Sequence, residues 1–398
     1  MIASSISDQS PLSSISDLKS PVNVLDFGAD PTGKRDSTDA IQNACRKNRH
    51  VYFPAGIYLV TSLSFGGSIT LQGSGNNTTV IKTTELTGNV FTFRGDGWHV
   101  ADMKFDAVHN RTDGAYIFST SNYASIRNVS FDRHYIGIDL DGSWTVDIEN
   151  VIAFDGTPES EAIGGAMIRL GNNAYTGPIH IRGLSAKTSD ATRQPSSCIT
   201  MGWVDVVSIS DALIIWHKKN IIISPDRNQF AALIEVTNSC FDTAKNGIYV
   251  KPTNGARVLR CGFANTWFGA HQEGEGMVID GTEGSVTGLQ FTNCMFMFNR
   301  GNGVSIFGEN VNGIYFSNCF SSANVGNGLD VRQQAKNIKW LGGVIGASHE
   351  GNGNTKYGYF VEPGCTGSIM CTDLTGNGMG VTNDVMDSFT TLGNTTGR

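Results

Sequence analysis

A repeat of about 25 residues dominates the second half of this sequence. Residues 291–294 (Phe-Thr-Asn-Cys) recur 25 positions later as residues 316–319 (Phe-Ser-Asn-Cys), and residues 299–304 recur at the same offset as 324–329. Weaker copies extend the pattern in both directions, at residues 126–138, 146–167, 236–248 and 369–379. A unit this short cannot bury an apolar face by itself, so successive units must stack on one another.

Within each unit, short stretches alternate between apolar and polar residues, as Ile179 and Ile181 do, and Asn or Gly separates these stretches. No run of ten or more residues in this region has helical periodicity, so the units are built of short strands. Strands in stacked units pair in parallel at ~4.8 Å. The pattern predicts an all-β fold, a right-handed single-stranded parallel β-helix.

The spacing of one repeat glycine predicts where loops leave the coils. The intervals from Gly247 to Gly276, Gly303, Gly328 and Gly358 are 29, 27, 25 and 30 residues. Because the stacked strands keep a constant length, the extra residues in the longer intervals must project as loops.

One amphipathic helix is expected ahead of the coils. It opens at residues 36–39, with Asp36 as the N-cap, and carries Ile41, Ala44 and Cys45 on one face. It should cover the open end of the β-helix, because an uncovered terminal coil exposes both core and strand edge. The expected organisation is a flexible N-terminal segment (1–20), a strand, cap helix and first coils (21–84), the parallel β-helix (85–381) and a C-terminal tail (382–398).

Composition excludes several classes of partner and cofactor. There are 29 basic and 36 acidic residues, which gives a net charge of −7 without basic clusters, so nucleic acid is not expected as a partner. No apolar run reaches the ~18 residues that a membrane span needs, so membrane insertion is not expected either. Residues 28–34 match most of a phosphate-binding P-loop, but Arg35 stands where Ser or Thr would hold magnesium. We expect no cofactor and no metal.

The eight cysteines form no CxxC pair, and residues 1–20 have neither the basic nor the apolar region of a secretory signal. We therefore expect reduced thiols that pack as small apolar side chains.

Four segments resemble the opening of the pectate-lyase-like parallel β-helix superfamily, in particular its bacteriophage tailspike and capsule depolymerase branch. They are residues 22–29 (Val-Asn-Val-Leu-Asp-Phe-Gly-Ala), 36–42, 51–58 and 69–75. The resemblance implies a homotrimeric spike on the phage tail of a virion. Such a spike acts at the bacterial cell surface, where it binds and cuts capsule or O-antigen polysaccharide. The catalytic motifs of the polygalacturonases are absent, so pectin is not the expected substrate.

The candidate catalytic residues come from the chemistry of glycosidic bond cleavage. Hydrolysis needs two carboxyl groups about 5 to 9.5 Å apart, whereas elimination needs a base and a group that neutralises a uronate. Asp242 is followed, about one coil later, by Glu273 and Glu275. The same loop offers Trp267 and His271 to hold sugars. The acids outnumber plausible bases, which slightly favours a hydrolase over a lyase.

Other constellations fit the same chemistry, and no motif separates them. Asp211 is a further catalytic candidate, with Trp216 and His217 expected to bind substrate. Arg227, beside Asp226, is another expected substrate-binding residue. Two further groups remain open: Asp155 with Glu159 and Glu161, and His134-Tyr135 beside Asp132 and Arg133, which would suit a lyase. The contrasting function is a receptor-binding spike that holds polysaccharide without cutting it.

Overall fold

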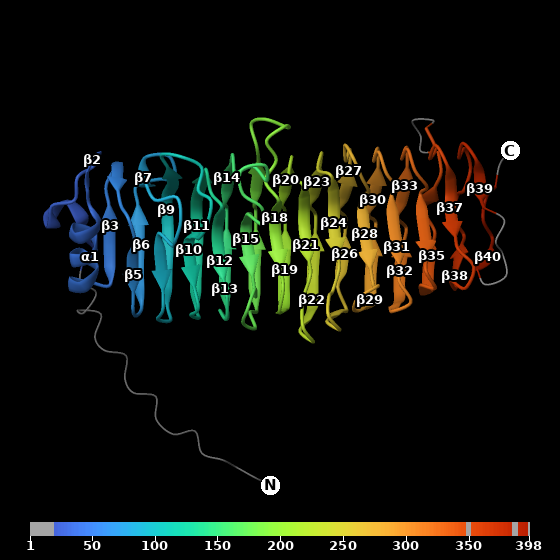
Figure 1. Ribbon diagram of the computed structural model, residues 1–398, viewed down its shortest axis with the longest axis horizontal. Helices are drawn as coiled ribbons and strands as arrows, with labels where there is room; N and C mark the ends of the chain where they lie inside the picture. Colours follow the sequence, from blue (N-terminus) through green and yellow to red (C-terminus); the bar gives the residue numbers. More distant parts are fainter. Residues whose placement is uncertain (1–19, 348–351, 384–388, 397–398) are drawn as a thin grey trace, which may run out of the picture.

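The computed structural model describes residues 20–347, 352–383 and 389–396, and it shows an elongated solenoid of parallel strands (Figure 1). The strands form one sheet of 13 and one of 27, and successive strands within each sheet pair in parallel. The predicted all-β, right-handed parallel β-helix is confirmed. The expected N-terminal segment lies, except for Ser20, outside the described residues.

The 13-stranded sheet receives one strand from each coil. Its strands are β5 (Leu63–Phe65), β8 (Phe91–Phe93), β10 (Ala115–Ser119), β12 (Ile136–Leu140), β15 (Ala166–Leu170), β18 (Ser197–Met201), β21 (Lys219–Ile223), β24 (Asn246–Val250), β28 (Met277–Asp280), β31 (Val304–Phe307), β34 (Leu329–Arg332), β37 (Tyr357–Val361) and β39 (Gly380–Thr382).

The 27-stranded sheet runs along the rest of each coil. Its strands are β1 (Val22–Asn23), β2 (Thr32–Asp36), β3 (His50–Phe53), β4 (Gly56–Leu59), β6 (Ile69–Gly73), β7 (Thr79–Thr83), β9 (Trp98–Ala107), β11 (Ala124–Asp132), β13 (Val146–Glu149), β14 (Ile152–Phe154), β16 (Ile179–Arg182), β17 (Ser185–Lys187), β19 (Val204–Ser210), β20 (Leu213–Ile215), β22 (Phe230–Thr237), β23 (Cys240–Asp242), β25 (Arg257–Leu259), β26 (Gly262–Ala264), β27 (Trp267–Gly269), β29 (Ser285–Thr292), β30 (Met295–Met297), β32 (Val311–Ser317), β33 (Phe320–Ser322), β35 (Lys336–Leu341), β36 (Val344–Ile345), β38 (Gly367–Met370) and β40 (Phe389–Leu392).

Aromatic rings stack from coil to coil in the interior. Phe263, Phe291, Phe316 and Trp340 form one column, with ring centroids 4.8, 4.7 and 4.6 Å apart. Burying each ring removes apolar surface from water, and each stacked pair adds about 0.5–1.5 kcal/mol. The repeated phenylalanines of the sequence are therefore core residues that lie one above another.

The repeated asparagines form two ladders at the turns. In the inner ladder, the side-chain amides of Asn299, Asn324 and Asn354 each donate to the side-chain oxygen one coil later, in a series that ends at Asn377, at 2.9, 2.9 and 3.0 Å. The outer ladder stands where the larger sheet bends, at residues with positive φ such as Asn238 and Asn265. Asparagine tolerates this left-handed conformation better than most residues.

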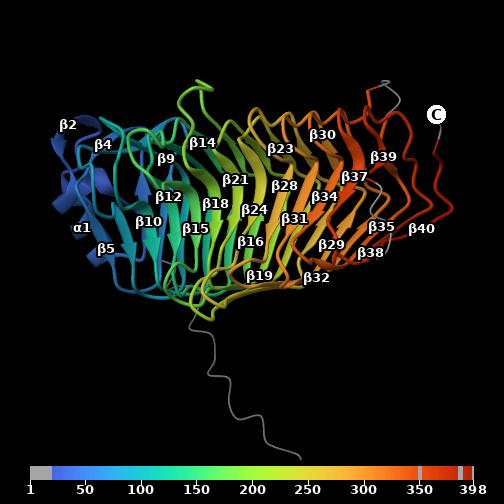
Figure 2. The ribbon, with the colours of Figure 1, turned by 45° about the vertical axis from the view of Figure 1, so that its right-hand side comes forward.

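The predicted cap helix is present as α1 (Thr38–Lys47), and it lies at the N-terminal end of the solenoid (Figure 2). Its Ile41, Ala44 and Cys45 are buried. The expected N-cap is wrong by one residue: Ser37 occupies that position, and Asp36 instead accepts a hydrogen bond from the backbone N–H of Thr38 at 2.8 Å.

At the other end, β40 pairs with β38, so the solenoid continues into the segment that was expected to be a C-terminal tail.

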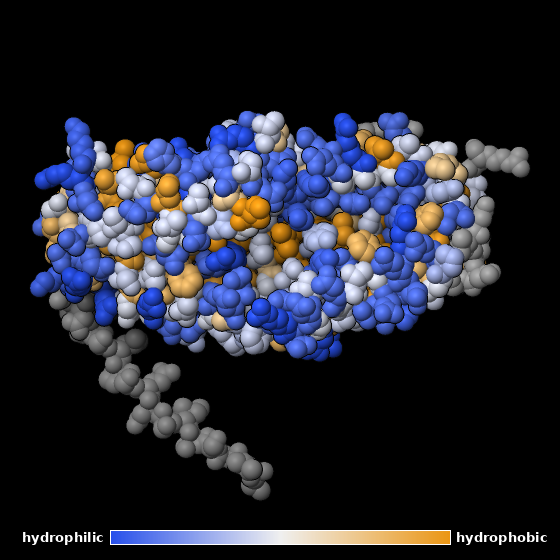
Figure 3. Space-filling view, viewed as in Figure 1, coloured by the Kyte–Doolittle hydropathy of each residue, from blue (hydrophilic) through white to orange (hydrophobic). Residues whose placement is uncertain are grey.

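The surface in Figure 3 is mostly hydrophilic, and hydrophobic side chains appear on this face in small separate groups. All eight cysteines are free; six are buried, Cys240 is half-buried and Cys371 is exposed. Within the residues that the structure describes, no helix is both long and apolar enough to span a membrane.

Candidate functional site

The structure separates the acids that the sequence analysis paired. Asp242 ends β23 in the 27-stranded sheet, whereas Glu275 lies just before β28 in the 13-stranded sheet. The turn before β28 places Glu273 at the surface, where its side chain is 57% exposed and pairs with Lys245 at 3.3 Å. Asp242 and Glu275 therefore stand on two different faces of the solenoid.

Asp242 is half-buried beside Trp267. Burial raises the pKa of its carboxyl group, and its Oδ1 has no hydrogen-bond partner among the described residues. Asp242 pairs with Gly269 in β27, and the indole of Trp267 covers that glycine. This acid has an aromatic neighbour, and among the described residues no second carboxyl group contributes to the shift of its pKa.

The two histidines expected to bind sugars are in the interior, so that expectation is wrong. His217 and His271 are 2% and 0% exposed, and desolvation lowers their pKa values to about 4 and about 3. The Nδ1 of His271 accepts a hydrogen bond from the backbone N–H of Ala244. A polysaccharide cannot reach either ring from the surface.

Asp211 belongs to the outer row of turn residues. It follows Ser210, which pairs with Thr237, so it occupies the same place as Asn238 on the next coil, and its φ is also positive. Trp216 follows the far end of β20, and the whole of that strand lies between it and Asp211. The expected group of Asp211, Trp216 and His217 is not brought together.

The other constellations line two separate cavities. Asp132, Arg133 and Asp155 line one of about 210 Å³, where the loops after β14 and β17 meet. Glu161 pairs with Arg193 at 2.8 Å at its rim, while His134 is buried. Arg227 lines a second cavity, of about 390 Å³, and its side chain is 85% exposed.

Glu275 occupies a position that asparagine fills on the neighbouring coils. The strand register aligns Asn246, Glu275, Asn302 and Asn327 in one row where the strands of the 13-stranded sheet begin. The backbone N–H of Glu275 donates to the side-chain oxygen of Asn246 at 3.1 Å, as the N–H of Asn327 donates to Asn302 at 2.6 Å. The row thus holds a carboxyl group where its neighbours hold amides.

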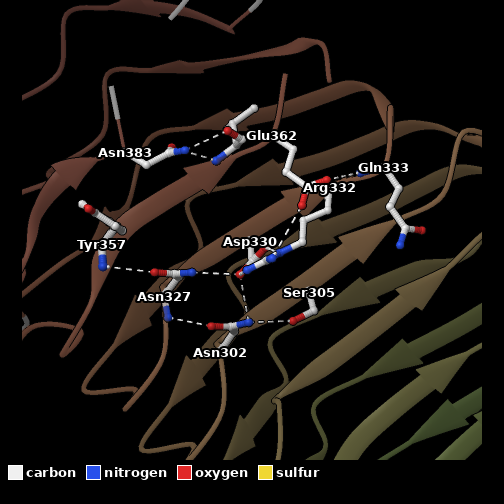
Figure 4. A network of polar contacts seen from close by, with 10 residues as sticks. Asn302, Ser305, Asn327, Asp330, Arg332, Gln333, Tyr357, Glu362 and Asn383 are labelled. Atoms are coloured by element: carbon white, nitrogen blue, oxygen red, sulfur yellow. Dashed lines mark hydrogen bonds and ion pairs between the residues drawn. The ribbon is translucent and has the colours of Figure 1, made fainter. Parts of the chain in front are cut away.

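A buried carboxylate lies on the same face, two coils further on. Asp330 is 3% exposed and accepts hydrogen bonds from Nε and Nη2 of Arg332, at 2.6 and 3.0 Å (Figure 4). Asn327 and Asn302 donate to its Oδ2 at 2.8 and 3.2 Å. Arg332 also reaches Glu362 at 3.6 Å. This network fixes a negative charge beneath the surface.

These surroundings raise the pKa of the Glu275 carboxyl group. Burial raises the pKa of its carboxyl group and the charge of Asp330 raises it further, while Lys245 opposes the rise. A half-buried glutamate in this position keeps its proton to higher pH than an exposed one does. A raised pKa beside a fixed charge is common at functional sites.

A tyrosine, a lysine and two further acids complete this surface. The Nζ of Lys251 lies 3.2 Å from both Asp280 and Glu283. Burial raises the pKa of Tyr249; Lys251 lowers it, while Asp280, Glu275 and Glu283 raise it. All three acids therefore act on one phenol. We call Tyr249, Lys251, Glu275, Asp280 and Glu283 the carboxylate face.

The carboxylate face can donate a proton, present a second carboxylate and pack an aromatic ring against a ligand. Sequence reasoning identified Glu275 but missed its neighbours. One signal was visible: residues that precede the repeat glycines are Asn246, Glu275, Asn302 and Asn327, so a lone acid interrupts the asparagines. Among the described residues, no three His, Cys, Asp or Glu side chains gather in a way that would hold a metal ion.

Comparison with protein families and curated sequences matches the N-terminal part of the chain. Residues 21–97 match the family model described as rhamnogalacturonase A/epimerase, pectate lyase-like. The phage-related protein YobO of Bacillus subtilis (strain 168) is 43% identical over 74 residues, which are 18% of this chain and 9% of that protein. Alginate lyase 7 of Azotobacter vinelandii is 33% identical over 113 residues, 23% of this chain and 13% of that one. The matches thus span a small part of either relative's length.

Solved structures resemble nearly the whole chain in fold. A double mutant of the tailspike protein of E. coli bacteriophage HK620 has a TM-score of 0.68 at 11% identity, over 94% of this chain and 78% of that one. The A-module of the mannuronan C-5 epimerase AlgE6 of Azotobacter vinelandii has a TM-score of 0.60 at 15% identity, over 94% and 99%. The chain is therefore a right-handed parallel β-helix with a pectate-lyase-like N-terminal part, and its structural neighbours include phage tailspikes and polysaccharide-active enzymes.

Proposed function

We propose that this protein is a tailspike depolymerase at the tail of a phage virion, which binds a bacterial surface polysaccharide and hydrolyses its glycosidic bonds. The similarity to a phage-related protein and to the tailspike fold supports this proposal, and one such tailspike was solved in complex with a pentasaccharide. The observation that carries it is Glu275, a surface acid whose pKa is raised by burial and by the charge of Asp330.

In this proposal Glu275 is the general acid that protonates the glycosidic oxygen. Glu283, beyond the other end of β28, is 50% exposed, and Lys251 holds it at 3.2 Å as a further carboxylate that a bound polysaccharide chain would meet. Tyr249 lies among these acids and offers a ring against which a sugar packs. Asp330 is a positioning residue, because it is buried and acts on the reaction only through the proton affinity of Glu275.

A general-acid role for Glu275 determines how activity changes with pH. The acid must carry its proton to donate it, so activity falls as pH rises through the raised pKa of Glu275. Replacing Asp330 with Asn removes the nearby charge, lowers the pKa of Glu275 and moves the alkaline limb of the profile to lower pH. A purely structural role for Asp330 would change protein stability but not the position of that limb.

The test is incubation of the full chain with purified bacterial capsular and O-antigen polysaccharides, alginate and polygalacturonate, followed by sizing of the products. Shortened chains without the absorbance of unsaturated uronates support a hydrolase. Shortened chains with that absorbance would make the protein a lyase. Binding without shortening would make it a receptor-binding spike. If the protein neither binds nor shortens any of these polysaccharides, the proposal is overturned.

A further inference from the structure

Four aromatic side chains from four coils gather where the chain passes from the 13-stranded sheet to the larger one. Tyr175, Trp203 and Phe230 directly precede Thr176, Val204 and Ala231, which pair in one row. The ring of Tyr175 lies 5.7 Å from that of Trp203 and 5.8 Å from that of Phe230. Trp144, which is 44% exposed, meets Tyr175 edge-on at 5.1 Å. We call these four residues the aromatic ladder.

A polar cavity of about 390 Å³ adjoins the aromatic ladder. Several residues of its lining lie one to three positions before a ladder residue in sequence: Asn172 and Asn173 before Tyr175, Gly202 before Trp203, and Gln229 before Phe230. Two of the four coils therefore supply both a ring and an amide near it in sequence: Tyr175 with Asn172 and Asn173, and Phe230 with Gln229. The lining also includes Arg227, whose guanidinium is exposed.

The ladder also carries polar atoms that are not used within the described chain. Tyr175 donates its hydroxyl to Oδ2 of Asp205 at 3.1 Å, but Oδ1 of Asp205 is buried without a partner among the described residues. The indole N–H of Trp203 is likewise buried without a hydrogen-bond partner among the described residues. Buried polar atoms normally find a partner, so these two atoms mark unused hydrogen-bonding capacity beside the rings.

We infer that the aromatic ladder and its cavity form an accessory polysaccharide-binding site, distinct from the carboxylate face. A pyranose ring presents C–H groups on one face, which pack on the electron-rich face of an aromatic ring, and hydroxyl groups at its edge, which amides and charged groups bind. The inference rests on the proposed function, because it takes the ligand to be the same polysaccharide chain.

The strand register connects the two sites. Thr200 lines the cavity, and it belongs to a row on the outer face of the 13-stranded sheet that continues through Ile222 to Tyr249. Those two steps cover about 10 Å at the usual strand spacing. One polysaccharide chain that runs along the solenoid axis can therefore touch the cavity and the carboxylate face together.

This arrangement predicts that affinity depends on glycan length. Loss of a ladder ring weakens binding of long polysaccharide but leaves the turnover number unchanged, because no ladder residue belongs to the carboxylate face. Oligosaccharides too short to reach the ladder are cleaved by such variants as they are by the unaltered protein. The effect appears in KM, as expected for binding energy that is equal in the ground and transition states.

The experiment uses a printed array of bacterial capsular and O-antigen polysaccharides, with Glu275→Gln as a non-cleaving background. Adding Trp144→Ala or Tyr175→Ala should weaken binding to the retained polysaccharide about tenfold per ring. Tyr175→Phe keeps the ring and should retain most of the affinity. Phe154→Ala removes an exposed ring that belongs neither to the aromatic ladder nor to the lining of the cavity, and it should change nothing. Trp144 is exposed, so its variant should fold even if changes at Tyr175 disturb the structure.

The outcomes separate the two proposals. Retention of polysaccharide that is unaffected by Trp144→Ala and by Tyr175→Ala overturns the accessory site and leaves the proposed function intact. If the background protein retains no polysaccharide and the unaltered protein shortens none, both fail together. Equal weakening for short and long substrates would place the ladder within the catalytic groove and would also overturn the inference.

Discussion

The imidazole Nδ1 of His271 accepts a hydrogen bond from the backbone N–H of Ala244 at 3.1 Å, and the backbone N–H of His271 donates to Oδ1 of Asn299 at 3.3 Å. The histidine therefore stands at the head of the inner asparagine ladder. An imidazole that accepts at Nδ1 is neutral, and its Nε2 has no partner among the described residues. Charging this ring would place an unpaired cation inside the solenoid.

This burial predicts that acid destabilises the fold. Desolvation lowers the pKa values of His134 and His271 to about 3 and that of His217 to about 4, whereas an unfolded histidine has a pKa of about 6.5. The folded state binds fewer protons between these values, so the stabilisation is present above pH ~6.5 and is lost as pH falls. Each histidine should cost about 2 kcal/mol of unfolding free energy between pH 7 and pH 5. Urea unfolding at both pH values measures this loss.

A matched pair of variants assigns the effect. His271→Asn extends the asparagine ladder by one amide and removes one titrating group, so about a third of the pH dependence should disappear. His180 is exposed on β16, and His180→Asn should leave the dependence unchanged. An unfolding free energy that stays constant from pH 7 to pH 5 would contradict the prediction.

The proposed acid is tested by conservative amide substitutions. Glu275→Gln keeps the size of the side chain but removes the transferable proton, so turnover should fall about 10²-fold or more while polysaccharide binding persists. Glu273→Gln removes only an exposed partner of Lys245, and Asp242→Asn changes the other sheet, so both should keep most of the activity. Product release from a fixed amount of polysaccharide measures all three.

The opposite pattern of activities would place the catalytic site at Asp242 and Glu273, as the sequence analysis expected. If Glu273→Gln and Asp242→Asn abolish turnover and Glu275→Gln does not, the carboxylate face is not catalytic. Circular dichroism of each variant confirms that the fold is retained.

The fold could be predicted from the sequence because the sequence repeat determines the strand register: residues one repeat apart pair on neighbouring coils. Phe291 and Phe316 are 25 residues apart in sequence and are paired neighbours in space, so the sequence offset gives the stacking directly. The side on which each turn residue lies could not be read in this way. Turns follow no two-residue alternation, so His271 and Glu273 looked alike in the loop, although one is buried and the other exposed.

The carboxylate face could not be predicted from the repeat alone, because it depends on how residues two coils apart are placed in three dimensions. Glu275 and Asp330 are 55 positions apart in sequence, and they interact because two coil steps and the bend before β28 bring their side chains to one face. No spacing rule within one repeat predicts that electrostatic interaction. Asp211 shows the opposite case, since its place in the outer asparagine row was visible from the residues aligned with it.

The thiols should be reduced and mostly unreactive. Burial raises the pKa values of Cys45 and Cys261 to about 12, and six of the eight cysteines are buried. Native titration with an aromatic disulfide reagent should modify exposed Cys371 first, half-buried Cys240 slowly, and the rest only after unfolding. Mass spectrometry that found several disulfides in the native protein would contradict this expectation.

The last prediction concerns assembly and rests on the outer face of the larger sheet. Leu213, Trp267, Met295 and Phe320 lie in one row on successive coils, with only Cys240 between the first two. Leu213, Met295 and Phe320 are 41%, 43% and 36% exposed. A closed threefold arrangement buries one such row on every chain, so we expect a homotrimer. Light scattering should give three times the 42.7 kDa chain mass.

Two charges placed in this row test its part in the assembly. Met295→Glu together with Phe320→Glu should yield a folded monomer, because each trimer contact would then bury unpaired carboxylates. Ile163→Glu, at an 80% exposed loop position, should leave the trimer intact. A trimer that survives the double change would move the interface to another face. A mass of 42.7 kDa for the unaltered protein at every concentration would contradict trimerisation itself.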